Sequence, residues 1–257
     1  MTDDVNIQYV DGLDRGLSYA ESCFETFRVI NGAIFAWDYH WQRLQQGLQS
    51  FGIVLTNQQQ ILQQCLNAAS HTSNDCLVRL TVSGGDAPWG LKQQATPSIF
   101  IQAQAFQATA TEIHLQSVEY PFPLIPKIAK FSSDYALTLR ASQKWGLNDV
   151  TTALICKDGV VLGGITANIA FFVDGQWLTP EGEGILAGTI RHSLMQQGLI
   201  QAQTCPTSLL EQTQAAVLLN SGSFIQVVHA INGKPLDTSH PAMADLQHAL
   251  QHEKGIR

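Results

Sequence analysis

YPFPLIPKIAKFSSDYALTLR, from Tyr120 to Arg140, divides the sequence into two parts. Three prolines stand within its first eight residues, and proline supplies no backbone N–H to a helix or to a central strand. We therefore expect a linker at residues 120–127, between a smaller domain at 1–119 and a second domain at 128–257. The remainder of the quoted stretch has the apolar spacing of a helix.

Strand and helix patterns alternate in the part before the linker. VNIQYV (Val5–Val10) alternates like a strand, and RVINGAIFAW (Arg28–Trp37) predicts a hairpin that turns at Asn31-Gly32. Asp38 is expected to cap the helix that follows. We therefore expect a small N-terminal α/β domain.

Short strands dominate the part after the linker. TTALICKDGVVLGGITANIAFFVDGQWL (Thr151–Leu178) contains two Asp-Gly turn signals between apolar runs, and TIRHSLMQQG (Thr189–Gly198) has a helical period. We expect a larger, β-rich C-terminal α/β domain here. The fold class predicted for the whole chain is α+β, with two domains.

Composition excludes several classes of protein. The chain has 257 residues, of which 45% are hydrophobic and 14% charged, and no apolar run reaches the roughly 18 residues of a membrane helix. Its formal net charge of −7 argues against broad nucleic-acid binding, which needs a basic face. The start, MTDDVNIQYV, has neither a basic leader nor an apolar segment, so we expect a cytoplasmic protein. The five cysteines form no CxxC pair and are odd in number, which indicates reduced thiols.

General catalytic and metal-binding signatures are missing from the sequence. It has no GxSxG elbow, HExxH motif or Walker loop, and its eight histidines show no metal-ligand spacing, so we expect no metal. GEGILAG (Gly182–Gly188) has the wrong spacing for a dinucleotide loop. Ser221, Ser223 and His229 lie in a strand region, where a structural role is the usual one.

Four stretches carry the functional prediction. They are DRGLSYAESCFETFRVINGAIFAWDYHWQRL (Asp14–Leu44), KFSSDY (Lys130–Tyr135), ILAGTIR (Ile185–Arg191) and LLNSGS (Leu218–Ser223). In this order and spacing they resemble the class IV aminotransferases, the fold-type IV pyridoxal-phosphate enzymes that include branched-chain and D-amino-acid aminotransferases and 4-amino-4-deoxychorismate lyase. The resemblance implies the two-domain D-amino-acid aminotransferase-like fold, with pyridoxal 5′-phosphate as the cofactor.

The resemblance makes Lys130 the catalytic lysine that forms a Schiff base with the cofactor. Such a lysine must be neutral often enough to react, which burial in a cleft achieves by lowering its pKa. Lys127 is the alternative. Lys130 is preferred because F-S-S-D-Y-A after it matches the family's K-x-x-x-N-Y-A, with Asp134 where Asn is common. Tyr135 then falls where the family has a tyrosine near the cofactor's phenolic oxygen.

The cofactor's phosphate needs an arginine and backbone N–H groups at a helix start, where the helix dipole favours an anion. The resemblance assigns this role to an arginine in HWQRL, to the start of the helix after Gly188 and to the end of a strand at LLNSGS, and it assigns a leucine to the ring face. Without the resemblance, Arg43 would be interpreted as a solvated helix residue. Besides Lys130 and Tyr135, the cofactor residues so assigned are Arg43, Leu186, Thr189, Ile190, Ser221 and Gly222.

One position departs from the family pattern. V-T-E-G-x-x-x-N usually supplies a glutamate that pairs with the ring nitrogen and keeps it protonated. Here the stretch is VLGGITAN (Val161–Asn168), with Gly163 in place of the glutamate. Three alternatives follow. The nitrogen is unprotonated or bound by water or a hydroxyl such as that of Thr166; an acid from elsewhere in the chain reaches it; or catalysis is lost or changed.

The activity that we expect is that of an aminodeoxychorismate lyase, which forms 4-aminobenzoate and pyruvate for folate biosynthesis. LLNSGSFIQ resembles the strand end of these lyases, and β-elimination demands less of the ring nitrogen than transamination. Thr26 and Ser221 are guesses for the hydroxyl that donates to the leaving oxygen. The alternatives are a transaminase for branched-chain or D-amino acids, and a cofactor-binding paralogue without this catalysis. Family membership implies a small-molecule amino substrate and a homodimer whose active sites are lined partly by the neighbouring subunit.

Overall fold

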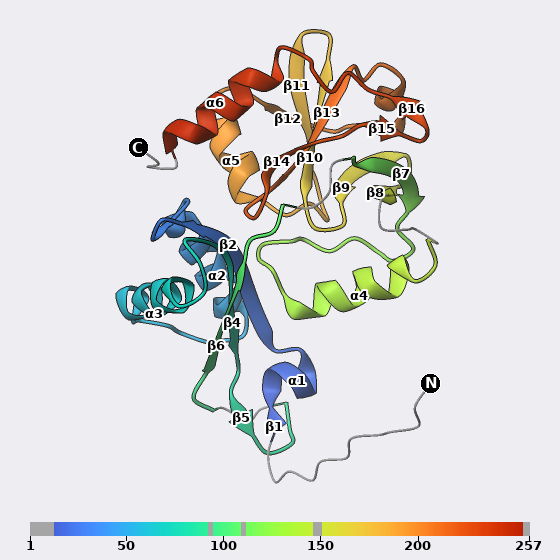
Figure 1. Cartoon of the computed structure of the whole chain (residues 1–257). Helices are drawn as coiled ribbons and strands as arrows, with labels where there is room; N and C mark the ends of the chain where they lie inside the picture. The colour runs from blue at the N-terminus through green and yellow to red at the C-terminus, as the bar shows by residue number, and fades with distance from the viewer. Residues whose placement is uncertain (1–12, 92–94, 109–111, 146–150, 254–257) are drawn as a thin grey trace, which may run out of the picture.

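An antiparallel sheet in the order β3-β2-β4-β6, with two helices on one face, forms the N-terminal part of the protein (Figure 1). The computed structural model describes residues 13–91, 95–108, 112–145 and 151–253. The elements of this part are β2 (Ser22–Ile30), β3 (Ala33–Ile34), α2 (Trp37–Ser50), α3 (Gln58–Ser70), β4 (Asp75–Ser83) and β6 (Ser98–Ala105).

Alternation along β2 gives its two faces different neighbours. Cys23, Phe27 and Val29 are buried in the core that the sheet shares with α2 and α3. Phe24, Thr26 and Arg28 lie on the other face, where the Phe24 ring contacts Tyr135 of the C-terminal half at 4.8 Å between centroids. One face of the sheet therefore builds a core, and the other approaches the C-terminal half.

The predicted hairpin is confirmed, and the predicted helix cap is wrong. β2 and β3 pair antiparallel, and Asn31 and Gly32 have φ angles of 50° and 77°, as a type I′ turn requires. α2 begins one residue before Asp38, because Ala36 takes a left-handed conformation at the N-cap. Asp38 therefore lies in the first helical turn, where its negative carboxylate still interacts favourably with the positive end of the helix dipole. The strand expected at residues 5–10 lies outside the described residues.

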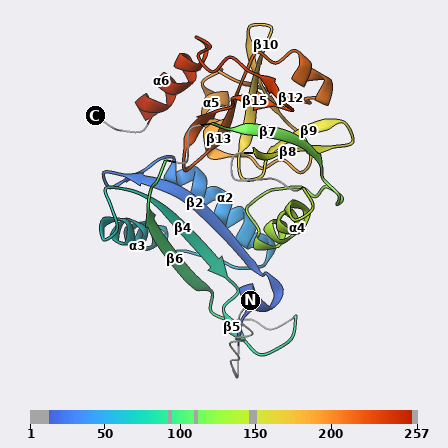
Figure 2. The same cartoon turned by 45° about the vertical axis from the view of Figure 1, so that its right-hand side comes forward.

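A short ribbon lies at one end of this part. It pairs β1 (Leu13–Asp14) with β5 (Asp86–Ala87), and α1 (Arg15–Tyr19) follows β1 directly. Both views place the ribbon at the end that points away from the C-terminal sheets (Figure 1 and Figure 2).

The C-terminal half contains two five-stranded sheets, in the orders β16-β15-β7-β8-β9 and β12-β11-β10-β13-β14. The strands are β7 (His114–Glu119), β8 (Thr151–Lys157), β9 (Val160–Gly164), β10 (Asn168–Val173), β11 (Gln176–Pro180), β12 (Gln201–Gln203), β13 (Ala215–Asn220), β14 (Phe224–Val227), β15 (Ala230–Ile231) and β16 (Lys234–Pro235). The helices are α4 (Ser132–Ser142), α5 (Thr189–Gln196) and α6 (Met243–Glu253), with a 3₁₀ turn at Thr207–Glu211.

Three apolar clusters stack these elements into layers. Leu154 and Val161 of the first sheet pack with Phe171 and Leu218 of the second sheet, so the two sheets share a core. The other face of the second sheet packs against α5 and α6. Ala141 of α4 joins a smaller cluster on the other face of the first sheet. The mixed architecture, with few helices around several sheets, confirms the α+β class.

The chain changes sheets before the proline-rich segment. β7, which ends at Glu119, pairs in parallel with both β8 and β15 and therefore belongs to a C-terminal sheet. Residues 120–127 form neither helix nor strand, as their prolines predict, and the division into domains at this segment stays a prediction. None of the described helices is long and apolar enough to cross a membrane.

Gly47 is the point where α2 touches the segment that leads to Lys130. A Cβ on Gly47 would lie 2.4 Å from the Cβ of Ala129 and 2.9 Å from the Sγ of Cys23. Alanine favours a helix over glycine by about 1 kcal/mol, but overpacking costs about 1 to 3 kcal/mol. We expect Gly47→Ala to lower the free energy of unfolding in urea by about 1 to 2 kcal/mol, and the exposed Gln46→Ala to change it by less than about 0.5 kcal/mol. Equal stability of the two variants would contradict this packing.

Candidate active site

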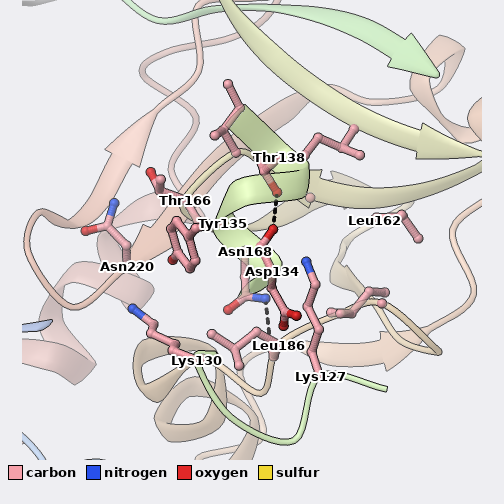
Figure 3. A pocket seen from close by; sticks show the side chains of 18 of the residues that line it. Lys127, Lys130, Asp134, Tyr135, Thr138, Leu162, Thr166, Asn168, Leu186 and Asn220 are labelled. Atoms are coloured by element: carbon pink, nitrogen blue, oxygen red, sulfur yellow. Dashed lines mark hydrogen bonds between the residues drawn. The ribbon is translucent and has the colours of Figure 1, made fainter. Parts of the chain in front are cut away.

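A cavity opens in the C-terminal half next to α2 (Figure 3). It encloses about 1050 Å³ including the open space at its mouth. Its wall is built by the segment before α4, the first turns of α4, the loop between β9 and β10, the loop before α5 and the end of β13. The charged side chains among its described lining residues are Arg43, Lys127, Lys130 and Asp134. The cavity is therefore positive, in a chain of formal net charge −7, and suits an anionic ligand.

Lys130 lies on the cavity wall, just before α4. Its carbonyl accepts a hydrogen bond from the amide of Phe24 (3.0 Å), so β2 holds the backbone of this segment. Burial lowers the pKa of Lys130 from 10.5 to about 8. Glu25 opposes this pKa shift, whereas the positive charges of Arg43 and Arg79 add to it. Near neutral pH, much more of this amine is uncharged than in an ordinary lysine.

Lys127, the alternative catalytic lysine, also lies on the wall. Burial lowers its pKa as well, and the charge of Asp134 opposes the shift. The two lysines differ in their surroundings, because the charges that act on Lys130 include Arg43 and the charge that acts on Lys127 is that of Asp134. Lys130 is therefore the lysine that shares its end of the cavity with the predicted phosphate arginine.

Arg43 is buried in a network of charges. Its Nε and Nη2 donate to the two carboxylate oxygens of Glu25 (2.7 and 2.6 Å), and its Nη1 donates to the carbonyl of Ala187 (2.6 Å). A guanidinium has five N–H donors, so two remain for a ligand in the cavity. Arg43 is only 5% exposed, which contradicts the alternative of a solvated helix residue.

Glu25 and His40 complete this network. Nδ1 of His40 contacts the Glu25 carboxylate at 2.7 Å, and its Nε2 lies 3.4 Å from the hydroxyl of Thr189. Burial alone would raise the pKa of Glu25, but hydrogen bonds from Arg43 and His40 outweigh it and lower the pKa to about 2. Burial also lowers the pKa of His40. The network therefore combines an ionised carboxylate with a neutral imidazole.

The loop before α5 is held from two sides. Nδ2 of Asn168 donates to the carbonyl of Leu186 (2.9 Å), and Arg43 holds the next carbonyl, that of Ala187. A Cβ on Gly188 would come within 1.9 Å of Oδ1 of Asn168, so this approach requires glycine. Gly188 is the N-cap of α5 and provides no side-chain cap. The first N–H groups of α5 therefore remain for an anion.

Tyr135 stands on the first turns of α4, with its ring edge-on to Phe24. Burial raises the pKa of its phenol, while the charges of Arg79 and Arg43 oppose that shift. The hydroxyl is therefore protonated near neutral pH and is able to donate a hydrogen bond into the cavity.

Six of the eight predicted site residues line the cavity, and two do not. The six are Arg43, Lys130, Tyr135, Leu186, Thr189 and Ser221. The side chain of Ile190 is buried in the core under α5, which leaves only its backbone N–H for a ligand. Gly222 faces Leu77 of β4, and its N–H donates to Oδ1 of Asn220 (2.9 Å). Asn220 thereby closes the turn that carries Ser221.

Gly163 lies on the cavity wall with a φ of +149°, which a residue with a side chain rarely adopts. It pairs with Ile155 next to an irregularity in the register of β8 and β9. A Cβ at this position would lie 3.1 Å from the carbonyl oxygen of Ala167. The backbone is therefore shaped for glycine, and β9 brings no carboxylate into the cavity at this point.

Sequence reasoning assigned no role to Arg79 or to the carboxylate of Asp134. The guanidinium of Arg79, on β4, lies 3.6 Å from the centroid of the Phe24 ring, and its charge acts on Lys130. In the sequence, Arg79 stands out only as an arginine within the alternating strand CLVRLTVSG. That alternation does not show which part of the protein the arginine-bearing face of the strand contacts. Thr26 pairs with Arg79 across β2 and β4 and is not among the described lining residues.

A family model for amino-transferase class IV matches residues 22–231 of the chain, which include all the predicted site residues. The chain belongs to the class IV aminotransferases. A comparison with curated protein sequences gave no match. Class IV aminotransferases are pyridoxal-phosphate enzymes, so this chain is a pyridoxal-phosphate-dependent enzyme.

Solved structures share the fold of this class IV aminotransferase. A putative 4-amino-4-deoxychorismate lyase from Legionella pneumophila has a TM-score of 0.78 and 21% identity, covering 98% of this chain and 96% of that chain. The 4-amino-4-deoxychorismate lyase of Pseudomonas aeruginosa has a TM-score of 0.77 and 20% identity, covering 97% of this chain and 96% of that chain. The T.th. branched-chain amino acid aminotransferase, solved with pyridoxamine 5′-phosphate, has a TM-score of 0.82 and 18% identity, covering 95% of this chain and 88% of that chain. The predicted fold type is therefore confirmed, and these identities leave the specific activity open.

The residues present fit the cofactor of this family. Lys130 offers an amine with a pKa of about 8 for the aldehyde. Arg43 and the start of α5 offer N–H donors to the phosphate, and Tyr135 offers a hydroxyl to the phenolic oxygen. These groups come from α2, the segment before α4, α4 and α5, so the folded chain is needed to assemble them.

The lowered pKa of Lys130 predicts how attachment of pyridoxal phosphate to the apoprotein depends on pH. Only the neutral amine reacts with an aldehyde, so the rate should rise about tenfold per pH unit and level off near pH 8. An ordinary lysine would level off only above about pH 10. Stopped-flow absorbance measures this rate; Lys130→Ala should abolish attachment, and Lys127→Met should retain it. A rate that still climbs at pH 10 would show that burial does not tune this amine.

Loss of the Glu25 carboxylate should destabilise the protein strongly. Glu25→Gln leaves Arg43 buried without its counter-charge, which costs about 3 to 5 kcal/mol. Asp75→Asn is the matched control, because the pair of Arg28 with Asp75 (2.5 Å) has an acid that is 41% exposed, and its loss should cost under about 1 kcal/mol. Urea denaturation at pH 7 measures both. Since the pKa of Glu25 falls from 4.5 to about 2, its contribution is complete above pH 4.5 and is lost as the pH falls through 2.

Proposed function

We propose that this chain is a lyase that converts 4-amino-4-deoxychorismate into 4-aminobenzoate and pyruvate, a reaction of folate biosynthesis. The observation that carries the proposal is the end of β13, where Asn220 and Ser221 line the cavity. This N-S strand end resembles that of the lyases, whereas branched-chain aminotransferases tend to have G-T-A-A-E. Oδ1 of Asn220 accepts the N–H groups of Gly222 (2.9 Å) and Ser223 (2.8 Å), which supports a fixed position for the Ser221 hydroxyl.

Arg79 supplies a positive charge for the substrate. Its Nε donates a long hydrogen bond to the hydroxyl of Thr81 (3.4 Å), and no described acid forms an ion pair with it. Its charge acts on both Lys130 and Tyr135. 4-Amino-4-deoxychorismate carries two carboxylates, one on the ring and one on the enolpyruvyl group. Arg79 is not itself among the described lining residues, but Lys130 and Tyr135 are, and we assign the charge of Arg79 to the binding of one of these carboxylates.

The chain's own residues divide the work of elimination. Bound pyridoxal phosphate supplies the aldehyde that joins the substrate amine and an electron sink for the neighbouring carbon. Lys130, with its pKa of about 8, removes the proton from the amine-bearing carbon. The C–O bond to the enolpyruvyl group then breaks, the substrate ring becomes aromatic, and the departing enolpyruvate takes up a proton to give pyruvate. We assign donation to the leaving oxygen to Ser221, because Thr26 is not among the described lining residues.

An amino-acid transaminase of the same fold is the second candidate. Such an enzyme differs in requiring an oxo acid that accepts the amino group. The observation that favours it is Asp134, an acid on the cavity wall that suits a protonated ring nitrogen. Gly163 therefore does not discriminate between the two activities by itself.

We also propose that the protein works as a homodimer in the cytoplasm. Large apolar side chains are exposed near the β1-β5 ribbon, namely Leu17 (74%), Trp89 (89%) and Leu91 (80%). Arg15 of α1 donates to the carbonyl of Gly90 (2.8 Å), so these side chains belong to one region, which suits contact with a second subunit. The five cysteines are free and buried, which suits a reducing compartment.

The lyase proposal predicts equal amounts of pyruvate and 4-aminobenzoate from 4-amino-4-deoxychorismate, without any added oxo acid. A lactate dehydrogenase assay measures pyruvate, and chromatography measures 4-aminobenzoate. Lys130→Ala should give neither product. Turnover of amino acids only when 2-oxoglutarate is present would establish the transaminase instead. Bound cofactor with no turnover in either assay would refute both.

Arg79→Met tests the assignment of the substrate carboxylate. Losing a hydrogen bond to a charged group should raise KM by about ten- to a hundredfold, with a smaller effect on kcat. Arg140→Met, on the exposed side of α4, should leave both constants unchanged. Unchanged KM in Arg79→Met would remove Arg79 from the site.

A further inference from the structure

The chemistry of pyridoxal phosphate relates the position of its ring nitrogen to that of the aldehyde. The nitrogen is para to the carbon that carries the aldehyde. With the aldehyde at Lys130, as the proposed function requires, the nitrogen points away from this amine. The family pattern assigns its partner to the position of Gly163, which lines the same cavity. β9 offers no side chain at this position, so any acid for the nitrogen has to come from another element.

We propose that Asp134 pairs with the ring nitrogen in place of the carboxylate that β9 lacks. Asp134 is the one acid among the described lining residues, and it is 8% exposed. A chain of neighbours connects it to Gly163. Gly163 pairs with Ile155, Ile155 packs in one cluster with Tyr120, and the charge of Asp134 acts on the phenol of Tyr120. The acid therefore comes from α4 instead of from the strand.

The framework makes little use of the Asp134 carboxylate. The backbone carbonyl of Asp134 accepts the hydroxyl of Thr138 (3.2 Å), but its carboxylate forms no ion pair with a described residue. Burial raises the pKa of Asp134, while the charge of Lys127 and a side-chain hydrogen bond with the neighbouring Ser133 oppose the shift. A buried carboxyl of this kind gains most from a cation that arrives with a ligand, and a protonated pyridine ring is such a cation.

Two departures from the family patterns complement one another. The K-x-x-x-N-Y pattern has an asparagine where this chain has Asp134, and V-T-E-G has a glutamate where it has Gly163. An amide cannot hold the negative charge that stabilises a pyridinium, whereas an aspartate can. The φ of +149° at Gly163 disfavours any side chain there. The negative charge that the ring nitrogen needs is thus supplied at position 134 instead of position 163, and both positions line the same cavity.

Lys127 offers the opposite arrangement. Figure 3 shows its side chain beside that of Asp134 and apart from Lys130. As an ammonium it would donate to a ring nitrogen that carries no proton. The two arrangements therefore differ in the location of one proton. Asp134 is favoured because it is the more deeply buried of the two, and because a positive ring nitrogen compensates a buried negative charge.

The protonation state of the ring nitrogen tests the proposal directly. Apoprotein is reconstituted with pyridoxal phosphate that carries ¹⁵N in the ring, and the ¹⁵N chemical shift reports whether the nitrogen bears a proton. We expect a protonated nitrogen in the wild type and in Lys127→Met. Asp134→Asn should give an unprotonated nitrogen and weaken cofactor binding by about ten- to a hundredfold. Asp134→Glu, which retains the carboxylate, should restore at least part of the protonation.

Each outcome is decisive. An unprotonated nitrogen in the wild type overturns the proposal, even if Asp134→Asn fails to fold. A protonated nitrogen with unchanged affinity in Asp134→Asn, folded according to its circular dichroism and melting temperature, also overturns it. Loss of the proton in Lys127→Met but not in Asp134→Asn would overturn it as well, because the protonation would then not depend on Asp134. Borohydride reduction with mass spectrometry separates this test from the proposed function, because absence of the link to Lys130 would contradict the cofactor site itself.

Discussion

The buried carboxylate of Glu25 is the interaction on which the candidate active site depends. It receives two hydrogen bonds from Arg43 and contacts His40, both on α2. Arg43 and His40 in turn reach Ala187 and Thr189 in the C-terminal half, so one ionised group from β2 joins a helix of one half to the start of α5 in the other. An isolated buried carboxylate would be costly, and the partners that remove this cost also build the anion-binding end of the cavity.

β2 positions the two ends of the site through one side chain and one backbone amide. Glu25 points toward α2 and fixes Arg43, whereas the backbone amide of its neighbour Phe24 binds the carbonyl of Lys130. A second contact, the bridge between Cys23 and Phe131, holds the segment just after the lysine. One strand therefore holds both the reactive amine and the anion-binding arginine. The distance between them cannot change without disrupting the core in which this strand is packed.

Much of this was readable from the sequence, where the signals are local. Asn31-Gly32 specified a turn that only left-handed residues satisfy, and the order of four motifs indicated the fold type and six residues that line the cavity. One miss is local, because the N–H of Gly222 is occupied by Asn220, two residues before it. The others involve long-range geometry, since no pattern showed that the charge of Arg79 would act on Lys130 or that Asp134 would be buried beside the cavity. Periodicity reports which face of an element is apolar but not which element it meets.

The position of β7 shows that the proline-rich segment does not separate the two sets of sheets. Although it precedes the prolines, it lies in the middle of its sheet, between β15 and β8, and both pairings are parallel. A polypeptide cut within residues 120–127 would leave this central strand on the N-terminal fragment and a gap in the C-terminal one. The C-terminal fragment would need the N-terminal one to complete its sheet. Recombination between relatives would therefore preserve the fold only if β7 travelled with the sequence that follows it.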